Sequence, residues 1–188
     1  LKFEEFFNNG IQQLLFNFPK DLITSSGAPF WSGPKKAPNP LTFDVEDQSH
    51  MDFVVAAANL RAFNYGLTGS RDLALYRQVL PTVKVPAFAP SSKVAIPASE
   101  EEAEAAKRKG SPDADQDDLD RLTKALPDPD SLVGYRMEPA EFEKDVDENF
   151  HIDFITACSN LRAHSYAIPP ADKHKTKGIA GKIIPAMV

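Results

Sequence analysis

An 18-residue segment of this chain occurs twice, 101 positions apart. The first copy spans residues 50–67 and the second spans residues 151–168, and they align without gaps at nine identical positions. Their lead-in segments, Pro40–Asp44 and Pro139–Glu143, match loosely, and acidic residues follow each of them. Two copies are too few for a solenoid, because such folds need three or more units to bury a continuous core. The duplication therefore predicts a pair of similar helices within one domain.

The composition of the first copy is typical of a buried helix. Residues 53–60 are apolar on nearly every face, which indicates burial on several sides. Ser49 is placed to cap this helix, and Gly66 and Gly69 end it. A shorter helix is expected to follow at residues 70–80 and to stop at the next residue, a proline.

The first 18 residues carry another helical pattern. Their apolar side chains recur at offsets of three and four and trace one stripe, which comprises Phe3, Phe6, Phe7, Ile11, Leu14, Leu15 and Phe18. Pro19 stops this helix, because the residue before a proline is pushed out of the helical region. The loop at residues 19–40 is rich in proline, glycine and serine. We expect Phe30 and Trp31 to anchor it to the body of the domain.

The middle of the chain has few large apolar side chains. Residues 84–130 form a variable insert with charged helical stretches, and we expect it to be partly mobile because it buries too little surface to offset the entropy of ordering. Strand-like alternation within residues 132–142 predicts pairing with residues 41–44. The expected fold class is mainly α (α+β), with a small strand pair, long proline-rich loops and a mobile acidic insert.

Bulk properties exclude several classes of function. A net charge of −6 argues against nucleic acid as the main partner. A single cysteine excludes an internal disulfide framework and a multi-cysteine zinc site, and it favours an intracellular compartment. No apolar run is long enough to span a bilayer, so no membrane partner is expected. Leu1 is not an initiator methionine and the last ten residues are mostly apolar, so we interpret the chain as a fragment.

Three side chains are the first candidates for catalysis. Cys158 lies in the middle of the second copy among apolar residues with no positive neighbour in sequence, and such burial disfavours a reactive thiolate. His50 and His151 each begin a copy, where they could act as acid–base groups. Their duplicated placement suits a shared packing role better than one active site, so we interpret all three as structural.

Charged runs are candidates for binding. The acidic residues 44–47 and 143–148 could hold a cation, although they lack the glycine and the oxygen spacing of a calcium loop, so solvated charge is the favoured interpretation. The basic tail could contact a phosphate or an acidic protein face, or could simply be solvated; it comprises Lys173, His174, Lys175, Lys177 and Lys182. His164 and His174 fit no metal-ligand spacing.

Several long segments together resemble the eukaryotic ubiquitin-activating enzyme (E1) family. The most distinctive are the loop Pro-Phe-Trp-Ser-Gly-Pro-Lys at residues 29–35 and the stretch Ala-Gly-Lys-Ile-Ile-Pro-Ala at residues 180–186. Others are residues 11–19, 40–44, 142–145, 151–163 and 168–177. The resemblance covers nearly the whole chain apart from about residues 84–130.

The resemblance implies a place within a larger enzyme. Residues 1–168 would be the later part of the second catalytic-cysteine half-domain, and residues 169–188 would be a linker and the start of the return into the adenylation domain. Enzymes of this family use ATP and magnesium to adenylate the ubiquitin C-terminus, form a ubiquitin–cysteine thioester and pass it to a conjugating enzyme (E2).

The catalytic cysteine and the nucleotide- and magnesium-binding residues of the family would lie upstream of Leu1, so no catalytic, cofactor-binding or metal-binding residue is carried over to this chain. We therefore expect the 188 residues to frame the thioester site, to be inactive alone, and to work in the cytoplasm and nucleus. Two alternatives remain: an activating enzyme for a ubiquitin-like modifier, and a non-catalytic protein-binding module that uses the Phe30–Trp31 loop.

Overall fold

The computed structural model describes residues 1–109, 112–132, 134 and 137–183 of the chain. The chain is mainly helical, as the sequence predicts, and it divides into two compact units. Residues Leu1–Ser91 and Met137–Val188 form the first unit, and Ser92–Arg136 form the second. No helix in the described part of the chain is both long enough and apolar enough to cross a membrane.

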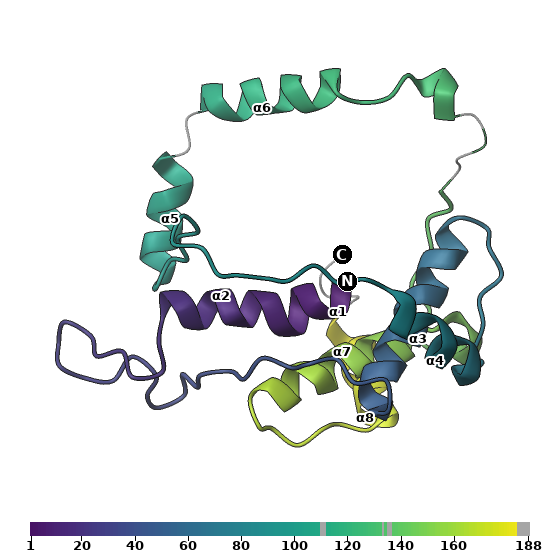
Figure 1. Cartoon of the computed structure of the whole chain (residues 1–188), viewed down its shortest axis with the longest axis horizontal. Coiled ribbons are helices and arrows are strands. Elements are labelled where there is room, and N and C mark those ends of the chain that lie inside the picture. The colour runs from purple at the N-terminus through teal and green to yellow at the C-terminus, as the bar shows by residue number, and fades with distance from the viewer. Residues whose placement is uncertain (110–111, 133, 135–136, 184–188) are drawn as a thin grey trace. The chain divides into compact units, whose positions relative to one another are not determined.

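The first unit contains the duplicated helices. Its elements in chain order are α1 (Lys2–Glu4), the π-helical turn η1 (Glu5–Asn9), α2 (Gly10–Asn17), α3 (Gln48–Asn64), α4 (Leu73–Val79), the 3₁₀ turn η2 (Leu80–Thr82), the 3₁₀ turn η4 (Asp147–Asn149), α7 (His151–Ser165) and α8 (Lys173–Ile183). Figure 1 labels the α-helices. The second unit contains α5 (Glu100–Lys109), α6 (Pro112–Lys124) and the 3₁₀ turn η3 (Pro129–Leu132).

The N-terminal helical segment covers the core of the first unit. Phe3, Phe7 and Ile11 are buried at a spacing of four, in agreement with the predicted stripe, whereas Phe6 is 50% exposed. The Phe3 and Phe7 rings pack against Phe53 of α3 at centroid distances of 6.0 and 5.2 Å. Burying large aromatic rings in this way supplies much of the stabilisation that orders the segment.

The two copies of the repeat pack directly against each other as α3 and α7. Phe53 and Phe154 occupy equivalent positions in the two copies, and their rings stack on each other at 5.7 Å. Ala56 and Ala157, which are also equivalent, are both buried. Because equivalent residues meet their own counterparts, the two copies are related by an approximate twofold axis through this contact.

The predicted strand pair between residues 41–44 and 132–142 is wrong for the described residues, among which no strand is present and the one β-bridge joins Ile23 to Pro29. Residues 133, 135 and 136 lie outside the described part. Backbone donors of the lead-in segments are used elsewhere. The Asn39 N–H donates to the Ser165 carbonyl of α7 at 2.7 Å, and the Glu138 N–H donates to the Asn64 carbonyl of α3 at 2.9 Å.

These two backbone bonds form a crossed pair. Asn39 and Glu138 each precede the first proline of a lead-in segment, and Asn64 and Ser165 are equivalent positions in the two copies. Each copy's lead-in segment therefore satisfies a carbonyl at the C-terminal end of the other copy's helix, where intrahelical partners are missing. The two lead-in segments do not form a strand pair, because backbone carbonyls of helices and histidine side chains accept the hydrogen bonds of their N–H groups.

The loop at residues 19–40 is held by its aromatic residues, as predicted. The Phe30 ring stacks on Phe18 at 4.6 Å, and the Trp31 indole N–H donates to the Phe18 carbonyl at 3.0 Å and the Pro19 carbonyl at 3.1 Å. The Lys35 ammonium lies 3.9 Å from the centre of the Phe30 ring. Both aromatic side chains thus fix the loop to the end of α2.

Candidate functional site

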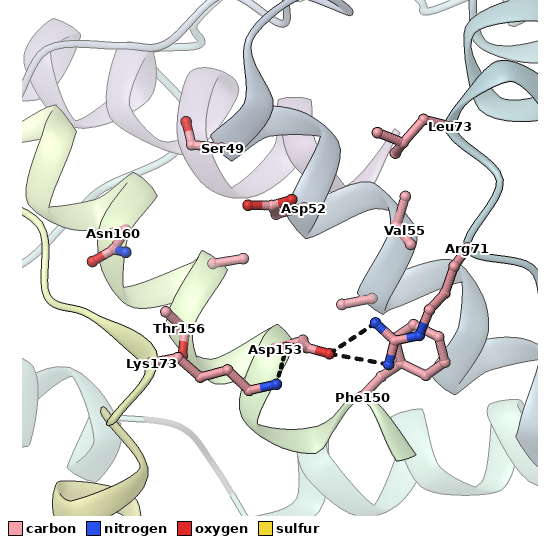
Figure 2. Close-up of a pocket in the computed structure, with 12 residues that line it drawn as sticks. Ser49, Asp52, Val55, Arg71, Leu73, Phe150, Asp153, Thr156, Asn160 and Lys173 are labelled. Atoms are coloured by element: carbon pink, nitrogen blue, oxygen red, sulfur yellow. Dashed lines mark hydrogen bonds and ion pairs between the residues drawn. The ribbon is translucent and has the colours of Figure 1, made fainter. Parts of the chain in front are cut away.

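A pocket of about 330 Å³ lies between the duplicated helices, where both copies contribute equivalent residues to its wall. The equivalent pairs are Asp52 with Asp153, Val55 with Thr156, and Ala56 with Ala157. Figure 2 shows Asp52 on α3 and Asp153 on α7, facing the same space. The small alanine side chains leave this space open, and the two aspartates make it polar.

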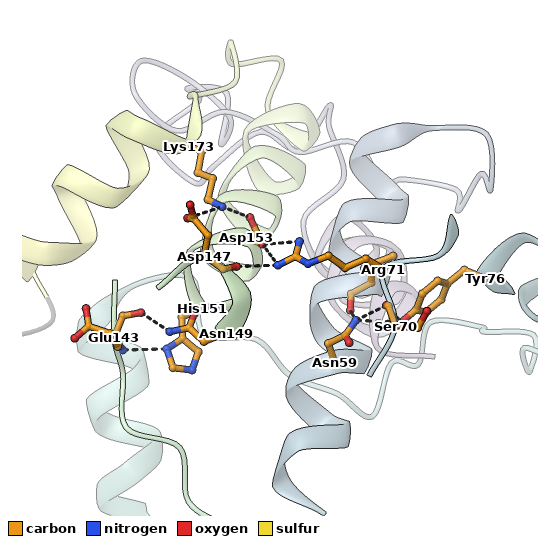
Figure 3. A network of polar contacts seen from close by, with 11 residues as sticks. Asn59, Ser70, Arg71, Tyr76, Glu143, Asp147, Asn149, His151, Asp153 and Lys173 are labelled. Atoms are coloured by element: carbon orange, nitrogen blue, oxygen red, sulfur yellow. Dashed lines mark hydrogen bonds and ion pairs between the residues drawn. The ribbon is translucent and has the colours of Figure 1, made fainter. Parts of the chain in front are cut away.

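Asp153 is the centre of a charged network at this pocket (Figure 3). Its carboxylate lies 2.7 Å from the Lys173 ammonium and 3.3 Å from the Arg71 guanidinium. Lys173 also reaches Asp147 at 3.1 Å, and Arg71 donates to the Asp147 carbonyl at 2.8 Å. The Arg71 guanidinium lies over the Phe150 ring at 3.9 Å. Arg71 comes from the first copy's exit segment, so this network ties the first copy to the second.

The network shifts the pKa of two of its members. The hydrogen bond that Lys173 donates to Asp153, followed by the one that it donates to Asp147, raises the pKa of Lys173 above its ordinary value. The hydrogen bond from Lys173 lowers the pKa of Asp147. Both shifts favour the charged forms of Lys173 and Asp147.

The two aspartates of the pocket differ in their partners. Asp153 has two cationic partners, whereas the Asp52 carboxylate accepts a hydrogen bond from the Gln48 side chain at 2.6 Å. The Thr156 hydroxyl also lies at this pocket, and it is buried without a hydrogen-bond partner in the described structure. The pocket is therefore a polar cleft in which ion pairs join the copies.

In each copy an asparagine side chain of the long helix hydrogen-bonds to the backbone of the segment that follows the helix, and we call this contact the asparagine clamp. Asn160 donates to the Ala171 carbonyl at 2.9 Å and accepts from the Ala171 N–H at 2.8 Å. Asn59, its equivalent, donates to the Ser70 carbonyl at 2.8 Å, to the Val55 carbonyl and to the Tyr76 hydroxyl. The clamped residue is eleven positions after the asparagine in both copies. The repeat therefore extends beyond its 18 residues to include the helix that follows, α4 or α8.

The basic tail contacts the chain's own acidic runs. Besides the Lys173 pairs, Lys177 lies 2.9 Å from Asp145. In the first copy the matching pair is Arg77 with Glu46, at 3.8 Å. Lys173 and Lys177 are thus used in ion pairs within the chain, whereas His174, Lys175 and Lys182 are exposed. Contact of the tail with a phosphate or with another protein stays a prediction.

The acidic runs are used as caps and as ion-pair partners. Asp47 caps α3, because its carboxylate accepts from the Ser49 and His50 N–H groups. Ser49, which was expected to cap this helix, instead donates its hydroxyl to Asp47 at 2.6 Å. Asp44 and Glu143 accept from backbone N–H groups two residues later. No group of three or more potential metal ligands occurs in the described parts of the chain.

The duplicated histidines hold the lead-in segments against their helices. His50 Nδ1 accepts the Asp44 N–H and His151 Nδ1 accepts the Glu143 N–H, both at 3.0 Å. The rings stack on Phe43 and Phe142, respectively, at 5.9 and 5.6 Å. Because Nδ1 is an acceptor in each ring, the neutral form carries its proton on Nε2. This geometry supports the structural interpretation of both histidines.

Cys158 packs at the edge of the core cluster formed by Phe3, Phe7 and neighbouring residues. Burial raises the pKa of its thiol to about 11. The thiol is therefore protonated at neutral pH, which is unfavourable for a nucleophile. His164 is exposed in the last turn of α7.

Sequence reasoning missed Arg71 and the two asparagine clamps. Both asparagines are identical positions of the repeat, and that identity was an available signal. No local sequence pattern marks Arg71 as a site residue, because its partner Asp153 lies 82 residues away in the second copy.

Comparison with known proteins agrees with the resemblance in the sequence. The model of the family described as "Ubiquitin-activating enzyme, SCCH domain" matches residues 1–177. Ubiquitin-activating enzyme E1 1 of Schizosaccharomyces pombe is 58% identical over 189 aligned residues, which cover 100% of this chain and 18% of that protein. The proteins named ubiquitin-like modifier-activating enzyme 1 are 56% identical in Dictyostelium discoideum and in Homo sapiens, over 100% and 96% of this chain and 19% and 17% of theirs.

The chain thus spans less than a fifth of the length of these curated relatives. The family match covers both copies of the repeat, both lead-in segments and the charged pocket between α3 and α7. This chain therefore belongs to the ubiquitin-activating enzyme family, as its SCCH domain.

Proposed function

We propose that this chain is the part of a ubiquitin-activating enzyme that frames the thioester site and helps to receive the conjugating enzyme. The parent enzyme would adenylate the ubiquitin C-terminus with ATP and magnesium, capture it as a cysteine thioester and transfer it to an E2, in the cytoplasm and nucleus. The observation that carries the proposal is the family match over residues 1–177, together with 58% identity to an E1 along the entire chain.

The chain's own residues fit a framing role. The stacked Phe53 and Phe154 rings, the crossed backbone bonds and the Arg71–Asp153 pair make the two copies one rigid body. A frame of this kind positions reacting groups without taking part in bond making. The acidic runs of the described residues do not fit a magnesium site, because they are used as caps and ion pairs and form no ligand cluster.

A thioester assay tests the proposal. The full-length parent, incubated with ATP, magnesium and ubiquitin, should form a thiol-sensitive adduct on a non-reducing gel, and the 188-residue chain alone should form none. Thioester formation by the isolated chain would overturn the framing role. Charging of a ubiquitin-like modifier in preference to ubiquitin would instead select that alternative.

A variant of the full-length enzyme separates framing from chemistry. Asp153→Ala removes the carboxylate that joins Arg71 to Lys173. Transfer to the E2 should slow, while ATP–pyrophosphate exchange, which reports adenylation, should stay unchanged. Lys175→Ala, an exposed change on α8, is the matched control. Equal behaviour of both variants would contradict the proposed role of the network.

The binding-module alternative is not favoured. Both aromatic side chains on which it depends are used inside the chain, Phe30 in its stack with Phe18 and Trp31 in its hydrogen bonds. Recruiting them to a partner would require these contacts to break.

A further inference from the structure

The approximate twofold symmetry of the repeat is broken by the N-terminal helical segment. That segment packs on two residues of the first copy and its lead-in, with the Phe3 ring 5.1 Å from the Phe43 ring and 4.7 Å from the His50 ring. The Leu41 N–H donates to the Phe7 carbonyl at 2.8 Å. Leu161 of α7 completes the same cluster and is fully buried. We call this surface, formed by Leu41, Phe43, His50 and Leu161, the occupied seat.

The equivalent residues of the other copy are Ala140, Phe142, His151 and Leu60. They are more accessible in every case: Leu41 is 8% exposed whereas Ala140 is exposed, and His50 is 4% exposed whereas His151 is half-buried. Phe142 is 37% exposed, whereas Phe43 is only partly so. Leu60 is half-buried, in contrast to Leu161.

A pocket of about 440 Å³ lies at this position. Leu60, Ala140 and His151 line it, together with apolar neighbours that include Phe63, Leu67 and Pro139. We call this surface, with Phe142 beside it, the open seat. Figure 3 shows the hydrogen bond between the Glu143 N–H and His151 Nδ1, which repeats the bond between the Asp44 N–H and His50 Nδ1. The geometry that receives a helix is therefore already formed in the second copy.

The helix α8 does not correspond to the occupant of this seat. It follows the clamped residue Ala171 as α4 follows the clamped residue Ser70, so α8 is the counterpart of α4. The counterpart of the N-terminal segment is a different helix.

The charges around the open seat indicate which charge the bound helix should carry. The residues lining this pocket and the adjoining one include Glu138, Glu141 and Glu148 and contain no lysine or arginine. Glu143 is exposed at the same margin. An acidic rim around an apolar floor favours a basic amphipathic helix.

We propose that the open seat binds an α-helix of a partner protein that carries two large apolar side chains one turn apart, flanked by lysine or arginine. The occupied seat is the template for this complex. Two rings at the spacing of Phe3 and Phe7 fill the floor, and a carbonyl of the bound helix accepts the Ala140 N–H, as the Phe7 carbonyl accepts the Leu41 N–H. The proposal is independent of the catalytic activity of the parent enzyme.

A synthetic peptide tests this site on the 188-residue chain. The probe is an acetylated, amidated peptide of residues 1–17 in which Glu4 and Glu5 are replaced by lysine. Titration followed by calorimetry and ¹H–¹⁵N NMR should show saturable 1:1 binding, with shifts concentrated at Leu60, Ala140 and His151. The peptide that retains Glu4 and Glu5 should bind at least threefold more weakly, and raising the salt concentration should reduce this difference.

Paired variants give the controls. Leu60→Asp and Ala140→Glu should each weaken binding at least tenfold, and Ala140→Glu lies outside any helix, so it tests the site even if Leu60→Asp unfolds. Leu75→Asp, at an exposed leucine of α4, should leave binding unchanged. A probe with serine in place of Phe3 and Phe7 should lose binding, whereas serine at the exposed Phe6 and Phe16 should not matter.

Three results would overturn the proposal. The first is an absence of saturable binding up to millimolar peptide. The second is a set of shifts centred on Leu41 and His50, which would show exchange with the resident helix. The third is a dimer of the chain that Ala140→Glu dissociates, which would make a second copy the occupant.

Discussion

Gly69→Ala is the substitution whose cost follows most directly from the geometry of the first asparagine clamp. A Cβ at position 69 would overlap with the Asn59 side-chain oxygen. The clamped amide would have to move, and its Nδ2 donates hydrogen bonds of 2.7, 2.8 and 3.1 Å. The amide has two N–H donors, so at a net value of about 1 kcal/mol for each donor their loss costs about 2 kcal/mol. The lower entropy of the unfolded alanine chain offsets about 0.5–1 kcal/mol, so the expected net loss is about 1–1.5 kcal/mol.

A double-mutant cycle identifies the cause. Asn59→Ala alone should cost about 2–3 kcal/mol, because it removes the same hydrogen bonds from a buried position. Adding Gly69→Ala to that background should stabilise the chain by about 0.5–1 kcal/mol, since the overlapping atoms are gone and the effect on the unfolded chain remains. The expected coupling is about 2 kcal/mol, well above the additivity error for independent sites.

Urea unfolding measures the four variants. The chain has a single tryptophan, Trp31, which lies in the first unit and reports its unfolding by fluorescence, with helix content followed in parallel. Gly178→Ala is the control, because a Cβ there meets nothing within 4 Å and the position lies inside α8. This change should stabilise the chain by about 0.5–1 kcal/mol. Additive effects of Asn59→Ala and Gly69→Ala would refute the reasoning.

Three further substitutions or measurements test separate features. Ala167 has a left-handed φ of 53°, and the equivalent residue of the first copy, Gly66, has a φ of 65°. In urea unfolding, Ala167→Gly should therefore stabilise the chain by roughly 0.5–1 kcal/mol and Gly66→Ala should destabilise it by about 1 kcal/mol. Effects of the opposite sign would exclude backbone strain at this turn. Cys158, with its pKa raised to about 11 from 9.0, should react with iodoacetamide about a hundredfold more slowly at pH 8 than the same thiol in urea, as mass spectrometry would show. Because the folded state holds this proton more tightly, the free energy of unfolding should be unaffected below about pH 9 and should fall as pH rises from 9 toward 11; a rise would contradict the burial. Asp47→Ala should lower the free energy of unfolding by about 1 kcal/mol and Asp47→Asn by much less, because asparagine also caps helices. Hydrogen bonds, first that from Ser49, lower the pKa of Asp47. The contribution of this cap should therefore be present above pH 4 and should be lost as the pH falls through the pKa of Asp47 in the folded state.

Local patterns in the sequence predicted the helices well. The stripe through Phe3, Phe7 and Ile11 located the N-terminal helical segment, and the two copies located α3 and α7. Phe6 was placed on the same stripe but is exposed, because the π-helical turn at Glu5–Asn9 changes the register on which a regular period of 3.6 depends. The pattern alone carries no sign of that turn.

Long-range contacts were the part that local patterns could not supply. The strand pair was expected from alternation alone, yet the Asn39 and Glu138 donors are taken by helix ends of the opposite copy. That outcome depends on which helices pack together, and single-residue propensities do not encode it. The Arg71–Asp153 pair has the same origin, because it exists only once α3 and α7 are in contact.

The crossed backbone bonds also set an order for folding during synthesis. The Asn64 carbonyl has no hydrogen-bond donor until Glu138 is synthesised, and the Asn39 N–H has no acceptor until Ser165 is synthesised. Ribosomes add about 5–20 residues per second, so the first copy spends roughly 5–20 s without its counterpart. During that time its apolar helix α3 lacks the α7 surface on which it packs. A stop codon between the copies would therefore release an unfinished half in which the Asn64 carbonyl and the face of α3 that packs on α7 have no partner.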